Sequence, residues 1–114
     1  MIELSDPEDT KMLTLARSAR GRTRAAEGAC VRDSDGRTYA AATVALDSLK
    51  LSAVQVAVAM AVSSGAKGIE AVAVLGESTV ARYDDLAAVR DLAGTGVTFL
   101  VATTDASVIG SVTT

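Results

Sequence analysis

The sequence predicts an α/β fold, a three-layer α/β/α sandwich with a mixed sheet, formed by residues 1–114 as one domain. Helical and strand-like apolar patterns alternate after an early hairpin, and this order favours strands joined by helices that cover both faces of a sheet. Of the 114 residues, 49% are hydrophobic and only 3% are aromatic. We therefore expect one core built of aliphatic side chains.

The first helix is expected over residues 7–26. The string Ser5-Asp6-Pro7-Glu8 combines a capping residue with a proline in the first helical turn and an acid behind it. Apolar residues with helical spacing follow, and Gly21 is a point where the helix could kink or end early.

A β-hairpin should follow, with strands over residues 28–32 and 37–45. Asp33-Ser34-Asp35-Gly36 separates them, and Asp-Gly is a strong signal for a hairpin turn. Cys30 falls on the first strand, where we expect a small buried side chain and not a reactive thiol.

A second helix should begin at Ser52, because Ser52-Ala53-Val54-Gln55 has the pattern of a capping box. The helix is apolar on every side and ends at Ser63-Ser64-Gly65. A helix that is apolar all round must be buried all round, so we expect cover from the sheet and from a neighbouring subunit. This is the main sequence evidence for an oligomer.

In the rest of the chain we expect a strand over residues 69–75 and a loop over residues 76–79. A helix over residues 83–93, closed by Gly94, and a strand over residues 97–102 should follow. The tail from residue 103 to 114 is small and polar apart from Val108, Ile109 and Val112, and we assign no helix or strand to it.

The composition excludes several classes of site. The chain has no histidine and one cysteine, which excludes Ser-His-Asp and Cys-His catalysis, an internal disulfide and a thiolate zinc site within the chain. The acidic N-terminal segment has no targeting pattern, and the longest apolar stretch, residues 51–62, is too short to span a bilayer. We expect a cytoplasmic protein with no membrane partner.

Four arginines, Arg17, Arg20, Arg22 and Arg24, lie within eight residues near the end of the first helix. On a continuous helix Arg17, Arg20 and Arg24 would share one face, where they could bind nucleic acid or another anion. Alternatively, they could be solvated cations that complement the helix dipole. We favour the second interpretation and expect no nucleic-acid partner, because the net charge is −3 and few aromatic side chains are available to stack on bases.

Several strings, in this order and spacing, resemble the cytidine deaminase family of small zinc enzymes, which hydrolyse cytidine to uridine. The strings are Glu27-Gly28-Ala29, Asp35-Gly36-Arg37, Thr43-Val44-Ala45, Ser52-Ala53-Val54 and Ala61-Val62-Ser63-Ser64-Gly65, and the resemblance spans roughly residues 7–102. It implies the three-layer fold of that family and a homotetramer, with a dimer as the alternative.

The resemblance also shows what this chain has lost. It places Ser52 at the first zinc-ligand position and Val54 at the proton-shuttle position, and an ungapped placement puts Arg82 and Asp85 at the other two ligand positions. Thr43 and Ala45 correspond to the substrate-binding Asn and Glu. Because these side chains cannot carry the zinc-dependent reaction, we expect a catalytically inactive member with no metal and no cofactor.

A ligand pocket is still expected at the start of the second helix. Its candidate residues are Thr43, Ser48, Lys50, Ser52 and Arg82, and they would suit a small nucleoside or a phosphate. In the simpler interpretation, Ser52 only caps the helix and Lys50 is solvated. Asp84 and Asp85, with Glu77 or Asp47, could instead hold Mg²⁺, although adjacent acids are also common in a first helical turn.

The sequence thus predicts an oligomeric, non-catalytic module that binds a small ligand or a protein partner. Two alternatives remain open at this point. One is a cytidine or nucleoside deaminase-type hydrolase that uses Asp84, Asp85 or Glu77 without zinc. The other is a regulatory subunit in an assembly with a catalytically complete relative.

Overall fold

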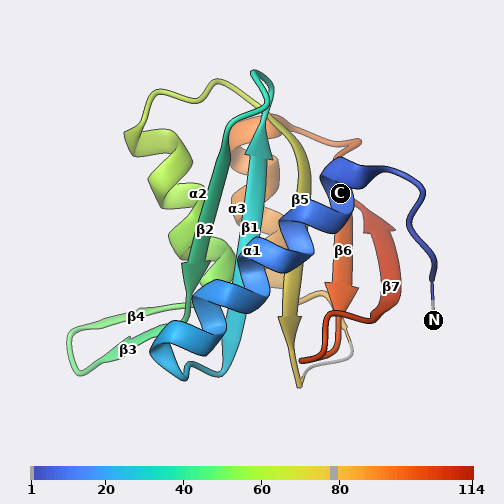
Figure 1. Cartoon of the computed structure of the whole chain (residues 1–114). Coiled ribbons are helices and arrows are strands. Elements are labelled where there is room, and N and C mark those ends of the chain that lie inside the picture. The colour runs from blue at the N-terminus through green and yellow to red at the C-terminus, as the bar shows by residue number, and fades with distance from the viewer. Residues whose placement is uncertain (1, 78–79) are drawn as a thin grey trace.

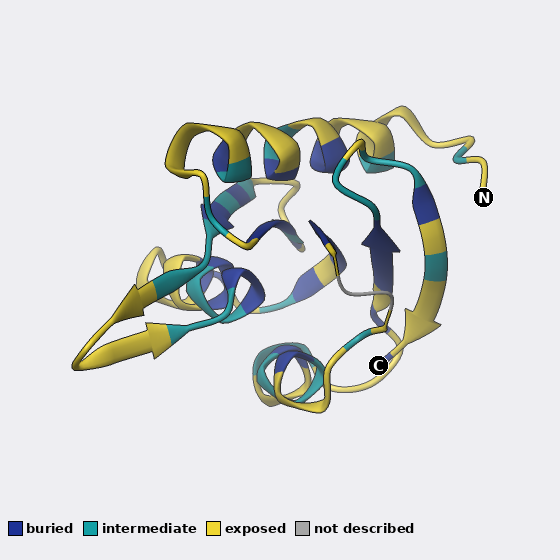
Figure 2. Cartoon of the chain, turned by 90° about the horizontal axis from the view of Figure 1, so that it is seen from below, coloured by how far each residue is buried: buried dark blue, intermediate teal, exposed yellow. Residues whose placement is uncertain are grey.

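A computed structural model of the protein, which describes residues 2–77 and 80–114, has three layers, with a mixed sheet between helices (Figures 1 and 2). The sheet has five strands in the order β2-β1-β5-β6-β7. Only β5 and β6 pair in parallel, and the other neighbours are antiparallel. The strands are β1 (Glu27–Asp33), β2 (Thr38–Ala42), β5 (Ile69–Gly76), β6 (Thr98–Ala102) and β7 (Val108–Thr113). The predicted fold class and the Asp-Gly hairpin are confirmed, while residues 78 and 79 of the predicted loop lie outside the described residues.

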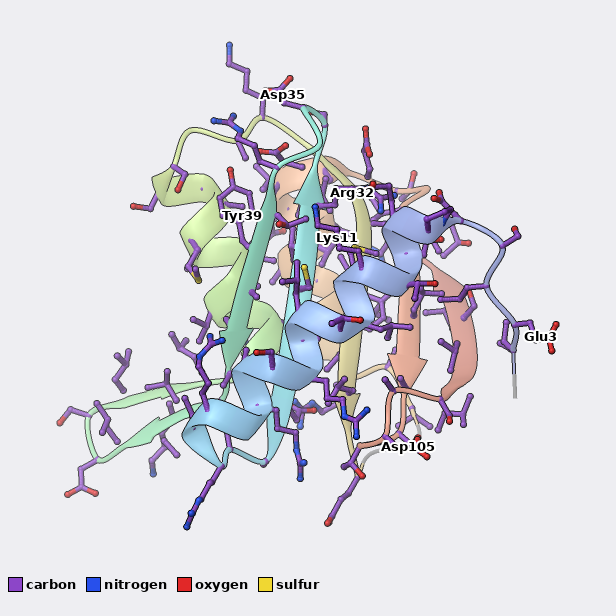
Figure 3. The ribbon with its side chains drawn as sticks, in the orientation of Figure 1. Glu3, Lys11, Arg32, Asp35, Tyr39 and Asp105 are labelled. Atoms are coloured by element: carbon purple, nitrogen blue, oxygen red, sulfur yellow. The ribbon has the colours of Figure 1, made fainter. Side chains whose placement is uncertain are left out.

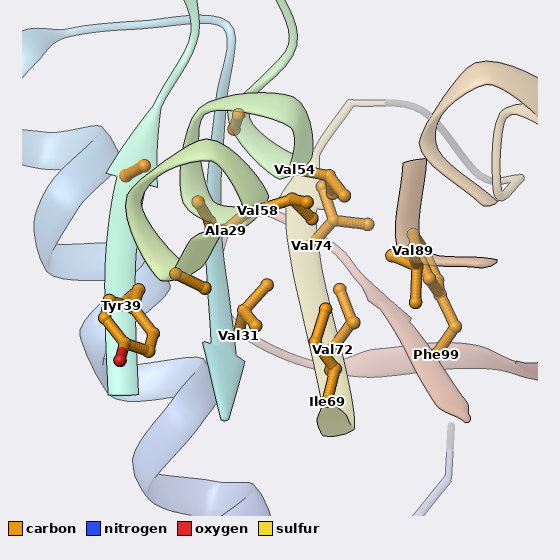
Figure 4. Close-up of a cluster of buried hydrophobic side chains, with 14 of the residues drawn as sticks. Ala29, Val31, Tyr39, Val54, Val58, Ile69, Val72, Val74, Val89 and Phe99 are labelled. Carbon is orange, nitrogen blue, oxygen red and sulfur yellow. The ribbon is translucent and has the colours of Figure 1, made fainter. Parts of the chain in front are cut away.

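Helices cover both faces of this sheet (Figure 2). The helix α1 (Pro7–Thr23) packs on one face, and α2 (Ala53–Ser63) and α3 (Tyr83–Ala93) pack on the other. Figure 4 shows the core beneath α2 and α3, in which Val54, Val72 and Phe99 are fully buried. The strand β5 is buried on both faces, which explains its near-continuous apolar sequence.

Cys30 is fully buried in the second core, beneath α1. Burial raises the pKa of its thiol to about 11 and outweighs the hydrogen bond and the nearby cations that favour the thiolate. The expectation of a small core side chain is therefore confirmed, and the raised pKa disfavours the thiolate form.

The helix α1 begins as predicted and ends earlier than predicted. Asp6 caps it by accepting a hydrogen bond from the Glu8 N–H at 2.9 Å. The helix stops at Thr23, and Arg24 takes a left-handed φ of 53°. The chain then reverses into β1, which packs closely against the helix: a Cβ on Gly28 would lie 2.0 Å from the Ala16 carbonyl oxygen. Arg24 is therefore beyond the helix and not on a helical face with Arg17 and Arg20.

The strand predicted over residues 37–45 is divided in two. After β2, the chain forms β3 (Val44–Leu46), which pairs with β4 (Leu49–Leu51) in a separate two-stranded hairpin that projects from the body of the molecule (Figure 1). The break occurs at Thr43, whose Oγ1 accepts a hydrogen bond from the Glu27 N–H at 3.0 Å. The string Leu46-Asp47-Ser48-Leu49, two apolar residues around a turn pair, was the signal for this hairpin.

The tail contains a strand that the sequence does not predict: β7 completes the sheet by pairing with β6. Val108 is the only buried residue of β7, so the strand lacks the regular apolar alternation by which a strand is recognised in a sequence.

The helix α2 has the predicted capping box. Ser52 Oγ accepts a hydrogen bond from the Gln55 N–H at 3.1 Å, and Gln55 Oε1 accepts one from the Ser52 N–H at 2.9 Å. The helix is not buried all round in the single chain, because the sheet covers one side and leaves Met60 and Val62 exposed. At 11 residues α2 is also too short to span a bilayer, and no helix in the described part of the chain is long and apolar enough to do so.

Candidate functional site

The N-terminal ends of α2 and α3 meet near the start of β1 and the carboxyl end of β5. Ser52 precedes α2, Arg82 precedes α3, and Glu27 begins β1. In open α/β sheets, ligands commonly bind beyond the carboxyl ends of the parallel strands. The fold therefore places a set of polar side chains where such a site is expected.

Four of these side chains form a continuous polar network, made of Glu27, Ser52, Arg82 and Asp85. Ser52 Oγ donates a hydrogen bond to Asp85 Oδ1 at 2.5 Å. Arg82 Nη2 lies 3.6 Å from Asp85 Oδ2 and also forms an ion pair with Glu27 Oε1. Glu27 and Asp85 are only 7% and 2% exposed, so Arg82 supplies the positive charge for two buried carboxyl groups.

The charge of Arg82 is well secured by this arrangement. Burial by itself lowers the pKa of the Arg82 guanidinium, but Glu27 and Asp85 outweigh that effect and raise the pKa above its ordinary value. The guanidinium has five N–H donors and no acceptor. Arg82 is therefore a fixed cation that can donate hydrogen bonds and cannot coordinate a metal ion.

A cavity of about 750 Å³ lies beside the polar network. Of the residues predicted from the sequence, Thr43, Lys50, Ser52 and Arg82 line it, whereas Ser48 does not and lies in the exposed turn between β3 and β4. The Thr43 hydroxyl also contacts the Glu27 backbone, which ties the cavity wall to β1. The structure thus gathers four of the five predicted residues around one space.

Three charged residues, Arg20, Arg24 and Glu27, were not predicted to line this cavity, although Arg20 and Arg24 were candidates for an anion-binding face of the first helix. Arg20 and Arg24 reach it from the end of α1, while Arg17 and Arg22 are not among its lining residues. Glu27 had been considered only as part of a scaffold string. An acid placed directly before the small and apolar run Gly28-Ala29-Cys30-Val31 was the available signal.

The acids considered for Mg²⁺ are distributed between two places. Glu77, Asp84 and Asp85 line the cavity, and Asp47 lies in the turn of the projecting hairpin. Within residues 2–77 and 80–114, no three His, Cys, Asp or Glu side chains are grouped closely enough to hold a metal ion.

Comparisons with known proteins agree on one family. The family model described as "Cytidine deaminase-like" matches residues 5–106. The cytidine deaminase from Burkholderia pseudomallei has a similar structure, with a TM-score of 0.80, 18% sequence identity and 91% of each chain covered. The cytidine deaminase from Mycobacterium leprae gives a TM-score of 0.74 at 18% identity, with 95% of this chain and 94% of that chain covered. A comparison with curated protein sequences gives no significant match.

The side chains at this site do not fit a zinc ion. Zinc is held in proteins by thiolate, imidazole or carboxylate ligands. The three positions that the resemblance assigns to ligands do lie together, but they carry a hydroxyl, a guanidinium and one carboxylate, in Ser52, Arg82 and Asp85. Val54, at the proton-shuttle position, is fully buried in the core, and its side chain has no group that can accept or donate a proton. No catalytic step through zinc follows from this set of residues.

Proposed function

The chain belongs to the cytidine deaminase-like family, and we propose that it is a non-catalytic member that binds a small ligand in the cavity beside the polar network. The observation that carries the proposal is the ion pairing of Arg82 with Glu27 and Asp85. By the resemblance, Arg82 stands at one of the family's metal-ligand positions, where a permanent cation cannot serve as a ligand, and the Glu27 and Asp85 carboxylates are engaged with it.

The remaining features of the site support binding. The cavity offers donors and acceptors from Thr43, Lys50 and Ser52, and about 750 Å³ is ample for a nucleoside-sized molecule. A ligand present at a hundred times its Kd would stabilise the folded protein by about 2.7 kcal/mol. A thermal-shift screen of nucleosides, nucleotides and phosphosugars detects such an effect directly.

Catalytic inactivity is tested by incubating the protein with cytidine, with and without added zinc, and following the absorbance change of conversion to uridine. We expect no conversion above a protein-free control. Turnover that Asp85→Asn abolishes would favour the second candidate function, a nucleoside hydrolase. The observation behind that candidate is the short contact between the Asp85 carboxylate and the Ser52 hydroxyl at the cavity wall.

We propose that the protein is an oligomer in solution, in which a second copy covers the exposed side of α2. Met60 and Val62 on α2, and Leu46 and Leu49 on the projecting hairpin, are large apolar side chains left exposed in the single chain. A mostly apolar groove lies between these two elements, lined by Tyr39, Leu51, Val56, Ala59, Met60, Ser63 and Ser64. A second chain that covers these surfaces would remove apolar area from water.

Light scattering after size-exclusion chromatography tests the assembly. We expect a particle of two or four times 11.5 kDa, and we expect Met60→Lys to dissociate it. Ile109→Lys is the matched control, because Met60 and Ile109 are each 39% exposed and Ile109 lies on β7. A monomeric wild-type protein, or dissociation by both variants equally, would contradict the proposed interface.

A further inference from the structure

The charged residues around the cavity are divided between two walls. Arg20 and Arg24 come from the C-terminal end of α1 and Lys50 from β4, whereas Glu77 follows β5 and Asp84 lies in the first turn of α3. The helices α1 and α3 lie on opposite faces of the sheet (Figure 2). We call Arg20, Arg24 and Lys50 the basic wall of the cavity, and Glu77 and Asp84 its acidic wall.

None of these five residues is neutralised by an ion pair within the described residues. The ion pairs recorded there involve Arg32, Arg37 and Arg82 with other acids. The buried acids Glu27 and Asp85 are paired with Arg82 and do not offset the basic wall. Three cations facing two separate carboxylates are left available to a ligand.

The basic wall is also partly held in place. Arg20 Nε donates a hydrogen bond to the Ala26 carbonyl oxygen at 3.2 Å, which bridges the end of α1 and the start of β1. Arg24 occupies a left-handed backbone position that glycine or asparagine usually takes. A pre-positioned guanidinium is suited to a phosphate group, because its planar N–H donors match the phosphate oxygens.

We propose that the cavity binds a sugar phosphate, with the phosphate against Arg20, Arg24 and Lys50 and the sugar hydroxyls donating to Glu77 and Asp84. The inference rests on the proposed function and specifies the chemical class of its ligand. A phosphate monoester carries about −1.5 to −2 charges at neutral pH, which matches the basic wall. Hydroxyl groups are the donors that unpaired carboxylates require, so one ligand of this class satisfies both walls.

Helix-dipole compensation alone would not account for this arrangement. It would use Arg22 as readily as Arg20, because both lie in the last turn of α1. Arg22, however, donates a hydrogen bond to Ser18 Oγ and is not among the residues lining the cavity. Arg22 is therefore the matched control for the basic wall.

The test is isothermal titration calorimetry of the whole 114-residue chain with ribose 5-phosphate, inorganic phosphate, ribose and cytidine. We expect binding of ribose 5-phosphate to be at least tenfold weaker in Arg20→Ala and in Arg24→Gly, and unchanged in Arg22→Ala. Arg24→Gly removes the cation and keeps a residue that adopts the left-handed conformation. Glu77→Gln and Asp84→Asn should weaken the binding of ribose 5-phosphate and leave the binding of inorganic phosphate unchanged.

The outcomes separate this inference from the proposed function. Binding of cytidine without binding of ribose 5-phosphate would overturn the inference and leave the binding function standing. Conversion of cytidine to uridine would overturn the proposed function, and binding of ribose 5-phosphate that depends on Arg20 and Arg24 would still support the basic wall. Affinity for ribose 5-phosphate that is equal in wild type, Arg20→Ala and Arg24→Gly would overturn the inference, as would the absence of binding.

Discussion

The hydroxyl of Ser52 connects the starts of two helices, because Ser52 Oγ lies 2.5 Å from Asp85 Oδ1 and also accepts the Gln55 N–H at 3.1 Å. The residue that caps α2 therefore also satisfies a carboxylate in the first turn of α3. Arg82 extends the connection to Glu27 at the start of β1. This network makes the site a structural junction of three elements as well as a wall of the cavity.

Ser52→Ala should destabilise the protein by about 2–4 kcal/mol. The change removes a helix cap, worth about 1 kcal/mol, and leaves the buried Asp85 with one fewer hydrogen-bond donor, which costs about 1–3 kcal/mol. Urea unfolding followed by circular dichroism measures the difference. Ser52→Thr, which keeps the hydroxyl, and Ser48→Ala, in the exposed hairpin turn, should each stay close to wild type. A loss of stability in Ser48→Ala as large as that in Ser52→Ala would contradict the role of Ser52 in joining the two helix starts.

Arg82→Met should lower the free energy of unfolding by about 1–3 kcal/mol, because it leaves the Glu27 and Asp85 carboxyl groups buried without their cation. Arg90→Met, on the exposed side of α3, is the control. The double variant Arg82→Met/Glu27→Gln should lower the free energy of unfolding by less than the sum of the changes in the two single variants. Strict additivity in this cycle would show that Arg82 and Glu27 are not coupled.

The turn between β1 and β2 should make stability depend on acid pH. Burial raises the pKa of Asp33, but hydrogen bonds from the Tyr39 hydroxyl and from the Arg37 and Asp35 N–H groups outweigh burial and lower the pKa below its ordinary value of 3.8. Figure 3 shows Tyr39 on the edge strand β2, beside the turn that carries Asp35. Stability from a lowered carboxyl pKa is present above the ordinary value and is lost as the pH falls through the lowered one.

Tyr39→Phe removes one of these donors, so its destabilisation should be larger at pH 7 than at pH 2.5. Urea midpoints at the two values give the comparison. Tyr83→Phe is the control, because Tyr83 is exposed and should show no difference at either pH. A Tyr39→Phe effect that is independent of pH would mean that the hydroxyl does not favour the ionised form of Asp33.

Gly28→Ala should destabilise the protein by about 1–3 kcal/mol or more, because the new methyl group would overlap the Ala16 carbonyl and force α1 away from β1. Gly21 lies in α1, where an added Cβ would meet no neighbouring atom within 4 Å. Gly21→Ala should therefore stabilise the protein by about 0.4–1 kcal/mol. Thermal unfolding of the two variants measures both effects. Equal shifts in Tm would disprove the close contact between helix and strand.

The sequence predicted features that depend on neighbouring residues. The Asp6 cap, the capping box at Ser52 and the Asp35-Gly36 turn each use interactions between residues a few positions apart, and the structure contains all three. The strand β7 escaped prediction because its pairing with β6 and not its own pattern makes it a strand. The hairpin of β3 and β4 had a local signal in its turn, but the break at Thr43 that separates it from β2 involves a contact with the distant Glu27.

The site shows the same division between local and distant information. Ser52, Arg82 and Asp85 could be named from a resemblance, but the ion pair of Arg82 with Glu27 joins residues 55 positions apart and leaves no trace in a local pattern. The contribution of Arg20 and Arg24 depends on where α1 ends. The helix ends at Thr23 with Arg24 in a left-handed conformation, three residues earlier than the sequence predicted.

The most direct test of the central claim is the zinc content of the purified protein after dialysis against zinc and removal of the excess, measured by mass spectrometry. With the Arg82 guanidinium between Glu27 and Asp85, we predict far less than one zinc ion per chain. One zinc ion per chain, lost in Asp85→Asn and retained in Asp84→Asn, would contradict the account.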